Sequence, residues 1–150
     1  MNRQFVWKKE YNIGIQRIDH QHQYFFQLIN WLLIRLDSSK DFKLKQRYID
    51  EVMYYARFHF CSEENLMKDH DYPELKQQEI LHGKLVKEMN YKISQLEFND
   101  IDTSDFVAFL SAWLLEHTIS EDKNSRIGEA HALLARPWQI GHVISAKPPR

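Results

Sequence analysis

Polar side chains that can bind a metal ion or move a proton interrupt four otherwise apolar stripes of this sequence. They are His22, His59, Glu63, Gln78, His82 and His117. Burying an unpaired polar group costs several kcal/mol. One such histidine would be an ordinary hydrogen-bonded core residue, but six polar groups on four stripes require a common explanation. Imidazole and carboxylate donors without thiolates are typical of sites for iron, manganese or zinc.

The elements that carry these residues are predicted to be helices, because the stripes recur at intervals of three and four residues. We expect helices over 18–37, 42–67, 74–97 and 104–121, with Thr103 or Ser104 as the N-cap of the last. Short connections favour antiparallel neighbours. The predicted fold class is therefore all-α, an up-down-up-down antiparallel four-helix bundle over residues 1–123. Residues 1–17 form an N-terminal arm packed on the bundle, and 124–150 form a C-terminal extension in which a short helix packs on the bundle.

Such a bundle brings the six polar groups into one layer. At 1.5 Å rise per residue, all of them fall roughly 6–12 Å from the same end. His59 and Glu63 are four residues apart, as are Gln78 and His82, so each pair shares one face of its helix. Convergence from four helices indicates a metal site inside the bundle.

Helical phase separates these residues from nearby polar ones. His20 lies about 200° around the helix from His22, so both cannot face inward. We assign the remaining histidines to the surface, namely His20, His70, His131 and His142. The same angle separates Cys61 from His59, and we expect Cys61 to be a packing residue rather than a redox thiol.

Two carboxylates remain open on spacing alone. Asp122 follows His117 by five residues and is about 140° out of phase with the stripe. It could reach a metal only if the helix distorts or ends there. Glu64 fits either the surface or a position behind the metal ligands.

Composition excludes several function classes. The chain has 150 residues, 20 basic against 21 acidic, and a net charge of −1, which argues against a nucleic-acid-binding stripe. One cysteine rules out an internal disulfide and a cysteine-based zinc or iron–sulfur site. The apolar stretch 106–115 is too short to span a bilayer, and the first residues lack the apolar run of a signal peptide. We expect a cytoplasmic monomer or weak homo-oligomer without nucleic-acid or membrane partners.

Four motifs of the chain resemble those of bacterial hemerythrins. They are Trp7…Gly14-Ile15…Ile18-Asp19-His20-Gln21-His22, His59-Phe60-Cys61-Ser62-Glu63-Glu64…Met67, Tyr72-Pro73 followed by His82, and Trp113-Leu114-Leu115-Glu116-His117…Asp122-Lys123. The resemblance covers roughly residues 5–123. Hemerythrins are four-helix bundles that hold a non-haem diiron centre and bind O2 reversibly.

The resemblance implies a set of ligands for two iron ions. His22 and His59 would bind the iron that receives O2 as a hydroperoxide, and His82 and His117 would bind the other. Glu63, Asp122 and an oxo or hydroxo group would bridge the two ions. The positions that match the apolar O2 pocket are Phe25, Phe60, Trp113 and Leu114, and beside them Thr118 is more polar than the usual aliphatic residue.

One ligand of the family pattern is missing, because Gln78 stands where hemerythrins have a histidine. Gln78 either binds weakly through its carbonyl oxygen or leaves the position to water, so the second iron would be weakly held and open to exchange. Our first interpretation is an oxygen-binding protein for storage, delivery or sensing rather than an enzyme.

Three alternatives stay open. The position at Gln78 favours a diiron peroxidase or oxidase. An iron-buffering or oxygen- or iron-responsive interaction module is a second, with Trp138, Ile140 and Val143 of the tail available to a partner of unknown identity. A helical bundle with hydrogen-bonded core histidines and no metal is the third.

Overall fold

Four long helices dominate the computed structural model, which describes residues 5–38 and 40–118. After a short 3-10 turn, η1 (Lys9–Tyr11), they are α1 (Gln16–Asp37), α2 (Phe42–Asp69), α3 (Leu75–Glu97) and α4 (Thr103–Glu116). This confirms the all-α fold class, and each helix begins within two residues of its predicted start. The predicted tail, 124–150, lies outside the described residues.

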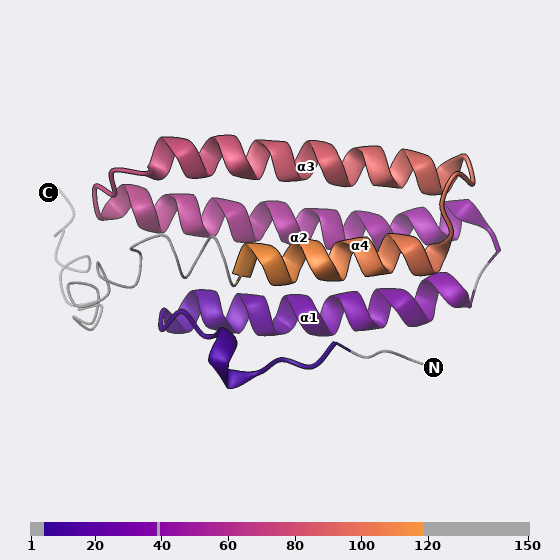
Figure 1. The fold of residues 1–150 in the computed structure, drawn as a ribbon, viewed down its shortest axis with the longest axis horizontal. Coiled ribbons are helices and arrows are strands. Elements are labelled where there is room, and N and C mark those ends of the chain that lie inside the picture. The colour runs from indigo at the N-terminus through magenta and orange to yellow at the C-terminus, as the bar shows by residue number, and fades with distance from the viewer. Residues whose placement is uncertain (1–4, 39, 119–150) are drawn as a thin grey trace, which may run out of the picture.

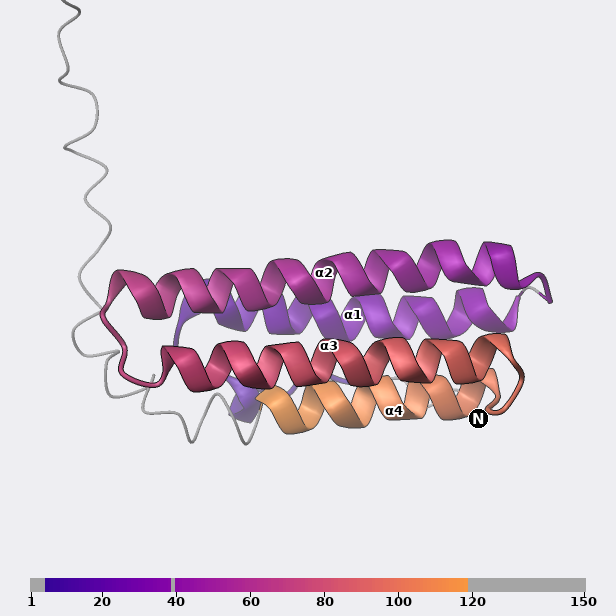
Figure 2. The ribbon, with the colours of Figure 1, turned by 90° about the horizontal axis from the view of Figure 1, so that it is seen from above.

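The helices form an antiparallel bundle in which each one packs against two neighbours. Helix α1 contacts α2 and α4, and α3 contacts the same two. Figures 1 and 2 show the four running alternately up and down along the long axis. The start of α1, the end of α2, the start of α3 and the end of α4 therefore lie at one end of the bundle (Figure 1).

Local chemistry sets the helix boundaries. The Asp41 carboxylate accepts a hydrogen bond from the Lys43 N–H at 2.9 Å and caps α2. The Asp102 carboxylate caps α4 by accepting from the Asp105 N–H at 2.8 Å, so the prediction that Thr103 or Ser104 is the N-cap was wrong. An aspartate at this position satisfies a backbone donor that the first helical turn leaves unpaired.

The apolar core is divided by the polar layer. A large cluster fills the bundle from Phe25, Ala56 and Phe60 onward, and a small cluster of Ile15, Ile18 and Met67 closes the end. On α1, His22 lies in sequence between Ile18 of the small cluster and Phe25 of the large one, and on α2 Glu63 lies between Phe60 and Met67. These polar groups therefore have apolar side chains on both sides along the bundle axis.

The described part of the N-terminal arm, from residue 5, packs along α1 (Figure 1). The Asn30 side chain makes two hydrogen bonds of 2.7 Å with the backbone of Phe5, one as acceptor from its N–H and one as donor to its carbonyl. Trp7 and Tyr11 pack against the large core cluster. These two hydrogen bonds to Asn30 therefore fix the arm to α1 at Phe5.

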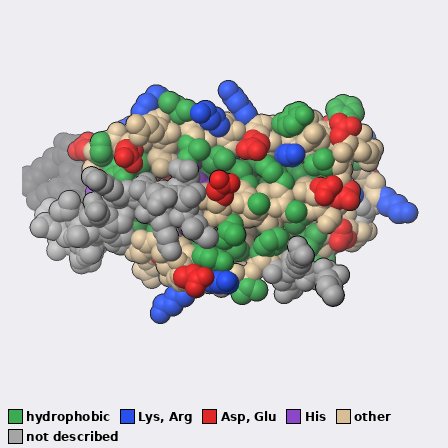
Figure 3. Space-filling model, in the orientation of Figure 1, with side chains coloured by type: hydrophobic (Ala, Val, Ile, Leu, Met, Phe, Trp, Pro, Cys, Tyr) green, Lys and Arg blue, Asp and Glu red, His purple; other side chains and the backbone are tan. Residues whose placement is uncertain are grey.

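The outside of the bundle carries mixed charge. Figure 3 shows acidic and basic side chains interspersed on the face in view, with no continuous basic stripe there. None of the helices among the described residues combines the length and the apolar character needed to cross a bilayer.

Candidate metal centre

The structure brings the predicted polar residues together in one buried layer. The exposed fractions are 0% for His22 and His59, 4% for Glu63, 3% for His82 and 2% for His117. Helix α1 supplies His22, α2 supplies His59 and Glu63, α3 supplies His82, and His117 follows the last residue of α4. These five side chains therefore converge on one layer of the bundle.

Glu63 lies at the middle of this cluster and presents one carboxylate oxygen to each pair of histidines. Its Oε1 is 3.2 Å from His59 Nε2 and 3.7 Å from His22 Nε2. Its Oε2 is 3.2 Å from His82 Nε2 and 3.5 Å from His117 Nε2. The two histidines of the first pair face each other, with their Nε2 atoms 3.1 Å apart. The carboxylate therefore divides the cluster into two halves.

A chain of hydrogen bonds fixes the orientation of His59. The Ser62 hydroxyl donates to the Phe58 carbonyl at 3.0 Å, so its oxygen accepts from Gln21 Nε2 at 3.1 Å. The Gln21 side-chain oxygen then faces His59 Nδ1 at 2.9 Å and, as an acceptor, requires Nδ1–H to donate this hydrogen bond. His59 consequently carries its proton on Nδ1, and the lone pair of Nε2 points at Glu63.

His82 is held in the same way by a charged partner. Its Nδ1 lies 2.7 Å from Glu64 Oε1, a distance typical of a charge-assisted hydrogen bond. The ring also stacks on Phe60, with centroids 4.1 Å apart and planes inclined by 9°. Glu64, left open on spacing, thus lies behind a candidate ligand. With the proton on Nδ1, the Nε2 lone pair of His82 also points at Glu63.

This arrangement fits a cation. Glu63 Oε1 and His82 Nε2 are buried and make no hydrogen bond within the described part of the chain. Lone pairs of imidazole nitrogens therefore converge on carboxylate oxygens in a buried site, which is repulsive until a positive charge lies between them. Possible ligand atoms of four of these residues lie within 4.8 Å of one another, namely those of His22, His59, Glu63 and His117.

Burial and neighbouring charges prepare these groups for metal binding. Burial lowers the pKa of His59 below its usual 6.5, although the adjacent Glu63 carboxylate opposes that shift. Burial alone would raise the pKa of Glu63, but His59 and His117 outweigh it and hold that pKa well below 4.5. At neutral pH the site therefore offers a neutral His59 imidazole and an ionised carboxylate, the forms that bind metals.

Aromatic side chains surround the cluster. The five residues that the resemblance assigns to an O2 pocket, Phe25, Phe60, Trp113, Leu114 and Thr118, are all buried. Phe25 lies 6.2 Å from the His59 ring and Trp113 lies 6.0 Å from the His117 ring, measured between centroids. The Thr118 hydroxyl is fully buried and finds no hydrogen-bond partner among the described residues. Gln78 is buried as well, one turn before His82.

The structure also corrects and extends the sequence reasoning. His20 and His70 are exposed, as predicted, but Cys61 is exposed too, so its expected packing role was wrong. Cys61 lies on the outer face of α2, so its thiol is directed away from the core as well as from the polar cluster. Asp122, with His131 and His142, lies outside the described residues.

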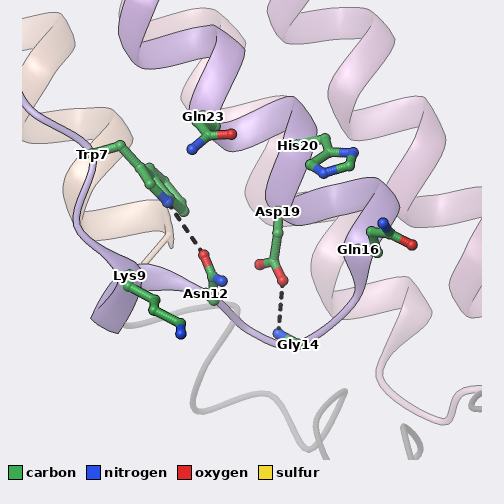
Figure 4. A pocket seen from close by; sticks show the side chains of 8 residues that line it. All are labelled: Trp7, Lys9, Asn12, Gly14, Gln16, Asp19, His20 and Gln23. Atoms are coloured by element: carbon green, nitrogen blue, oxygen red, sulfur yellow. Dashed lines mark hydrogen bonds between the residues drawn. The ribbon is translucent and has the colours of Figure 1, made fainter.

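Asp19 has a structural role that spacing did not single out. Its carboxylate accepts the N–H groups of Ile13 and Gly14 at 2.7 and 3.0 Å, where the chain turns into α1 (Figure 4). Gly14 has a φ of 92°, which a residue with a Cβ rarely adopts. The turn fixes the first residues of α1, and His22 follows one turn later.

Curated relatives cover most of the chain. A bacteriohemerythrin of Clostridium acetobutylicum is 27% identical over 124 residues, 79% of this chain and 96% of the relative. A bacteriohemerythrin of Stenotrophomonas maltophilia is 31% identical over 119 residues, 79% of this chain and 76% of the relative. Among solved structures, a crystal structure of a leucine-to-phenylalanine mutant matches with a TM-score of 0.70 and 21% identity, covering 83% of this chain and 95% of the other, which supports the fold.

The family comparison covers the metal-binding layer. The protein-family model described as the hemerythrin HHE cation binding domain matches residues 13–124, a range that contains every candidate ligand. The family implies non-haem iron, and the buried cluster of histidines around Glu63 suits such an ion. The chain belongs to the hemerythrin family of cation-binding domains.

Proposed function

We propose that this protein binds O2 reversibly at a non-haem diiron centre, for oxygen storage, delivery or sensing. In this proposal His22 and His59 hold one iron, and His82 and His117 hold the other. Glu63 and Asp122 would provide carboxylates to both ions, together with an oxo or hydroxo group. Two ferrous ions held in this way supply the electrons and the open coordination position that reversible O2 binding requires.

The observation that carries the proposal is the division of the cluster by Glu63. Each of its carboxylate oxygens faces a different pair of imidazole Nε2 atoms, at 3.2 to 3.7 Å. This is the arrangement expected of a carboxylate that bridges two cations. Four of the side chains, His22, His59, Glu63 and His117, could surround one ion, and His82 on the second oxygen of Glu63 is the ligand that supports a second ion.

The protein's own groups would keep the site dry and selective. Phe25, Trp113 and Leu114 are buried around the histidines and would limit the access of water to the site. Thr118 adds a buried hydroxyl directly after His117, and this unsatisfied donor is available to a small polar ligand. Water exclusion thus favours binding over reduction.

The role proposed for Asp122 depends on a departure from α-helical phase. His117 and Thr118 lie in a wider, π-type turn after α4. Such a turn inserts an extra residue and shifts the phase of the residues after it, and it often occurs at functional sites. A distortion at this position is what the five-residue spacing requires.

A second candidate, a diiron peroxidase or oxidase, is favoured by the half of the centre that contains His82 and His117. Gln78, buried one turn before His82, is a weaker donor than imidazole and would leave that metal open to exchange. A groove between α3 and α4, lined by Leu81, Trp113 and His117 among others, encloses about 340 Å3 and reaches this half. In this second candidate, peroxide would enter through the groove and reach the half that lacks one histidine.

Anaerobic iron loading followed by exposure to O2 tests both candidates. We expect about two irons per chain, with visible charge-transfer bands that appear under O2 and fade when O2 is removed. Glu63→Gln should lose most of the iron, whereas Glu79→Gln, at an exposed glutamate that pairs with Lys76, should retain it. Glu79→Gln is the control, because it removes a carboxylate that lies outside the cluster.

Other outcomes discriminate between the alternatives. Two irons with rapid irreversible oxidation and turnover of peroxide would replace the oxygen carrier with the peroxidase or oxidase. Iron that binds and leaves without any response to O2 would indicate iron buffering. Fewer than two irons in the wild-type chain would contradict the diiron proposal.

A further inference from the structure

We propose that Glu64 is a positioning residue that holds His82 in one tautomer and strengthens it as a metal ligand. This interaction would recover part of the metal affinity that is lost because residue 78 is a glutamine and not a histidine. The effect on metal binding rests on the proposed function, whereas the effect on the tautomer concerns the imidazole alone.

The geometry of the contact is well defined on both sides. Glu64 Oε1 lies 2.7 Å from His82 Nδ1, across the interface between α2 and α3. The imidazole is 4% exposed and the glutamate side chain 31% exposed, so the bond joins a buried ring to a carboxylate at the edge of the core. Phe60 stacks on the same ring and prevents it from turning away. One residue before Glu64, Glu63 faces the opposite nitrogen at 3.2 Å.

The other half of the centre has a neutral partner at the corresponding place. His59 Nδ1 meets the amide oxygen of Gln21 at 2.9 Å rather than a carboxylate. The two halves are therefore unequal in charge. The carboxylate lies behind the half in which Gln78 stands one turn from His82, which is where a stronger imidazole donor is most needed.

The expected effect follows from the chemistry of imidazole. A carboxylate that accepts the Nδ1 proton fixes Nε2 as the donor atom and increases its basicity. An amide acceptor fixes the same tautomer but increases the basicity of Nε2 less than a carboxylate does. Removal of such an outer partner lowers metal affinity by about 10- to 100-fold in other metal sites. Glu64 should therefore act by two separable means, tautomer and charge.

Two substitutions separate these means. Glu64→Gln keeps an oxygen that can accept the proton and removes the charge, whereas Glu64→Leu removes both. Glu79→Gln on the exposed face of α3 is the matched control, since it also removes one carboxylate. The tautomer of His82 is read from its imidazole ¹⁵N shifts in metal-free protein. Metal binding is read from Co2+ titration followed by visible absorption.

We expect His82 to carry its proton on Nδ1 in the wild type and in Glu64→Gln, and to lose that preference in Glu64→Leu. The dissociation constant of the lower-affinity Co2+ site should rise about 10- to 100-fold in Glu64→Leu and by less in Glu64→Gln. Glu79→Gln should leave both unchanged. If Glu64 had only a structural role, Glu64→Gln would bind Co2+ as tightly as the wild type. A lower Co2+ affinity with an unchanged His82 tautomer therefore indicates an effect of the charge.

Each contrary result has a distinct meaning. An unchanged His82 tautomer in Glu64→Leu overturns the positioning role, whether or not metal binds. Equal Co2+ affinities for wild type and Glu64→Gln overturn the effect of charge. A wild-type chain that binds no Co2+ and no Fe2+ refutes the proposed function instead, and the ¹⁵N spectra then still decide the tautomer.

Discussion

The phenyl ring of Phe60 lies face to face with the imidazole of His82, with centroids 4.1 Å apart and planes inclined by only 9°. The two residues belong to different helices, α2 and α3. Because Phe60 is buried and close-packed, its ring limits rotation of the imidazole. One helix thereby sets the plane of a candidate ligand that the other supplies.

Replacement of this ring should destabilise the metal-free protein. Phe60→Leu keeps an apolar side chain but removes the stacking and leaves a small cavity, and we expect a loss of about 1–3 kcal/mol in the free energy of unfolding. Phe58→Leu, at a 52% exposed position of the same helix, should change it by no more than about 0.5 kcal/mol. Urea denaturation of both variants measures the difference, and equal losses would deny Phe60 its packing role.

Acid should destabilise the metal-free protein in two steps. The pKa of His59 is lowered in the folded state, so its contribution to stability is complete above about 6.5 and is lost as pH falls below that value. The pKa of Glu63 is lowered below 4.5, so its contribution is lost only at more acidic pH. Urea denaturation between neutral pH and pH 4 measures the first step.

Two histidine variants control this profile. His59→Gln should flatten the decline that begins near pH 6.5, because the buried imidazole no longer has to be kept neutral. His70→Gln, at an exposed position, should leave the decline in place. A profile that His59→Gln does not alter would assign the acid sensitivity to other groups.

Tyr55 should ionise only at strongly alkaline pH. Its hydroxyl donates to the Gln21 carbonyl at 3.0 Å, and burial together with nearby Tyr24 raises its pKa to about 12. Because the folded state favours the neutral phenol, this contribution to stability is lost as pH rises from about 10 to about 12. Ultraviolet titration should lose its most alkaline step in Tyr55→Phe. That variant should also lose about 0.5–1.5 kcal/mol of stability at neutral pH.

Gln78→His should tighten binding of the second iron. The substitution adds an imidazole one turn before His82, on the same face of α3, and we expect iron to dissociate at least about 10-fold more slowly. Chelator competition against the loaded protein measures this rate. Gln77→His, at the exposed neighbouring position, is the control and should have no effect. Equal rates for wild type and Gln78→His would mean that residue 78 does not face the metal.

The four helices and the buried polar layer could be predicted from sequence because both depend on periodicity. Spacing of three and four residues places His59 and Glu63 on one face whatever surrounds them. The same reasoning could not find Gln21 or Glu64 as partners of His59 and His82. Each contact joins two helices, so it depends on the rotation and depth of both, which a single stripe does not contain.

The errors have physical causes of the same kind. The cap of α4 is Asp102 because the helix begins at Thr103, one residue earlier than predicted, and residue type alone does not separate Asp from Ser as a cap. Residue type favours a core position for Cys61, although its phase on α2 points outward. At Cys61 the position on the helix, rather than the residue type, determines that the side chain is exposed.

The convergence of lone pairs around Glu63 links the lifetime of this protein to metal supply. An ion that binds only the folded chain stabilises it by mass action, by about 2.7 kcal/mol at a free concentration 100 times the dissociation constant. When metal is scarce, that increment disappears and a larger fraction of molecules unfolds and is degraded. The cellular abundance of the chain would then fall with metal availability, even with no change in its synthesis.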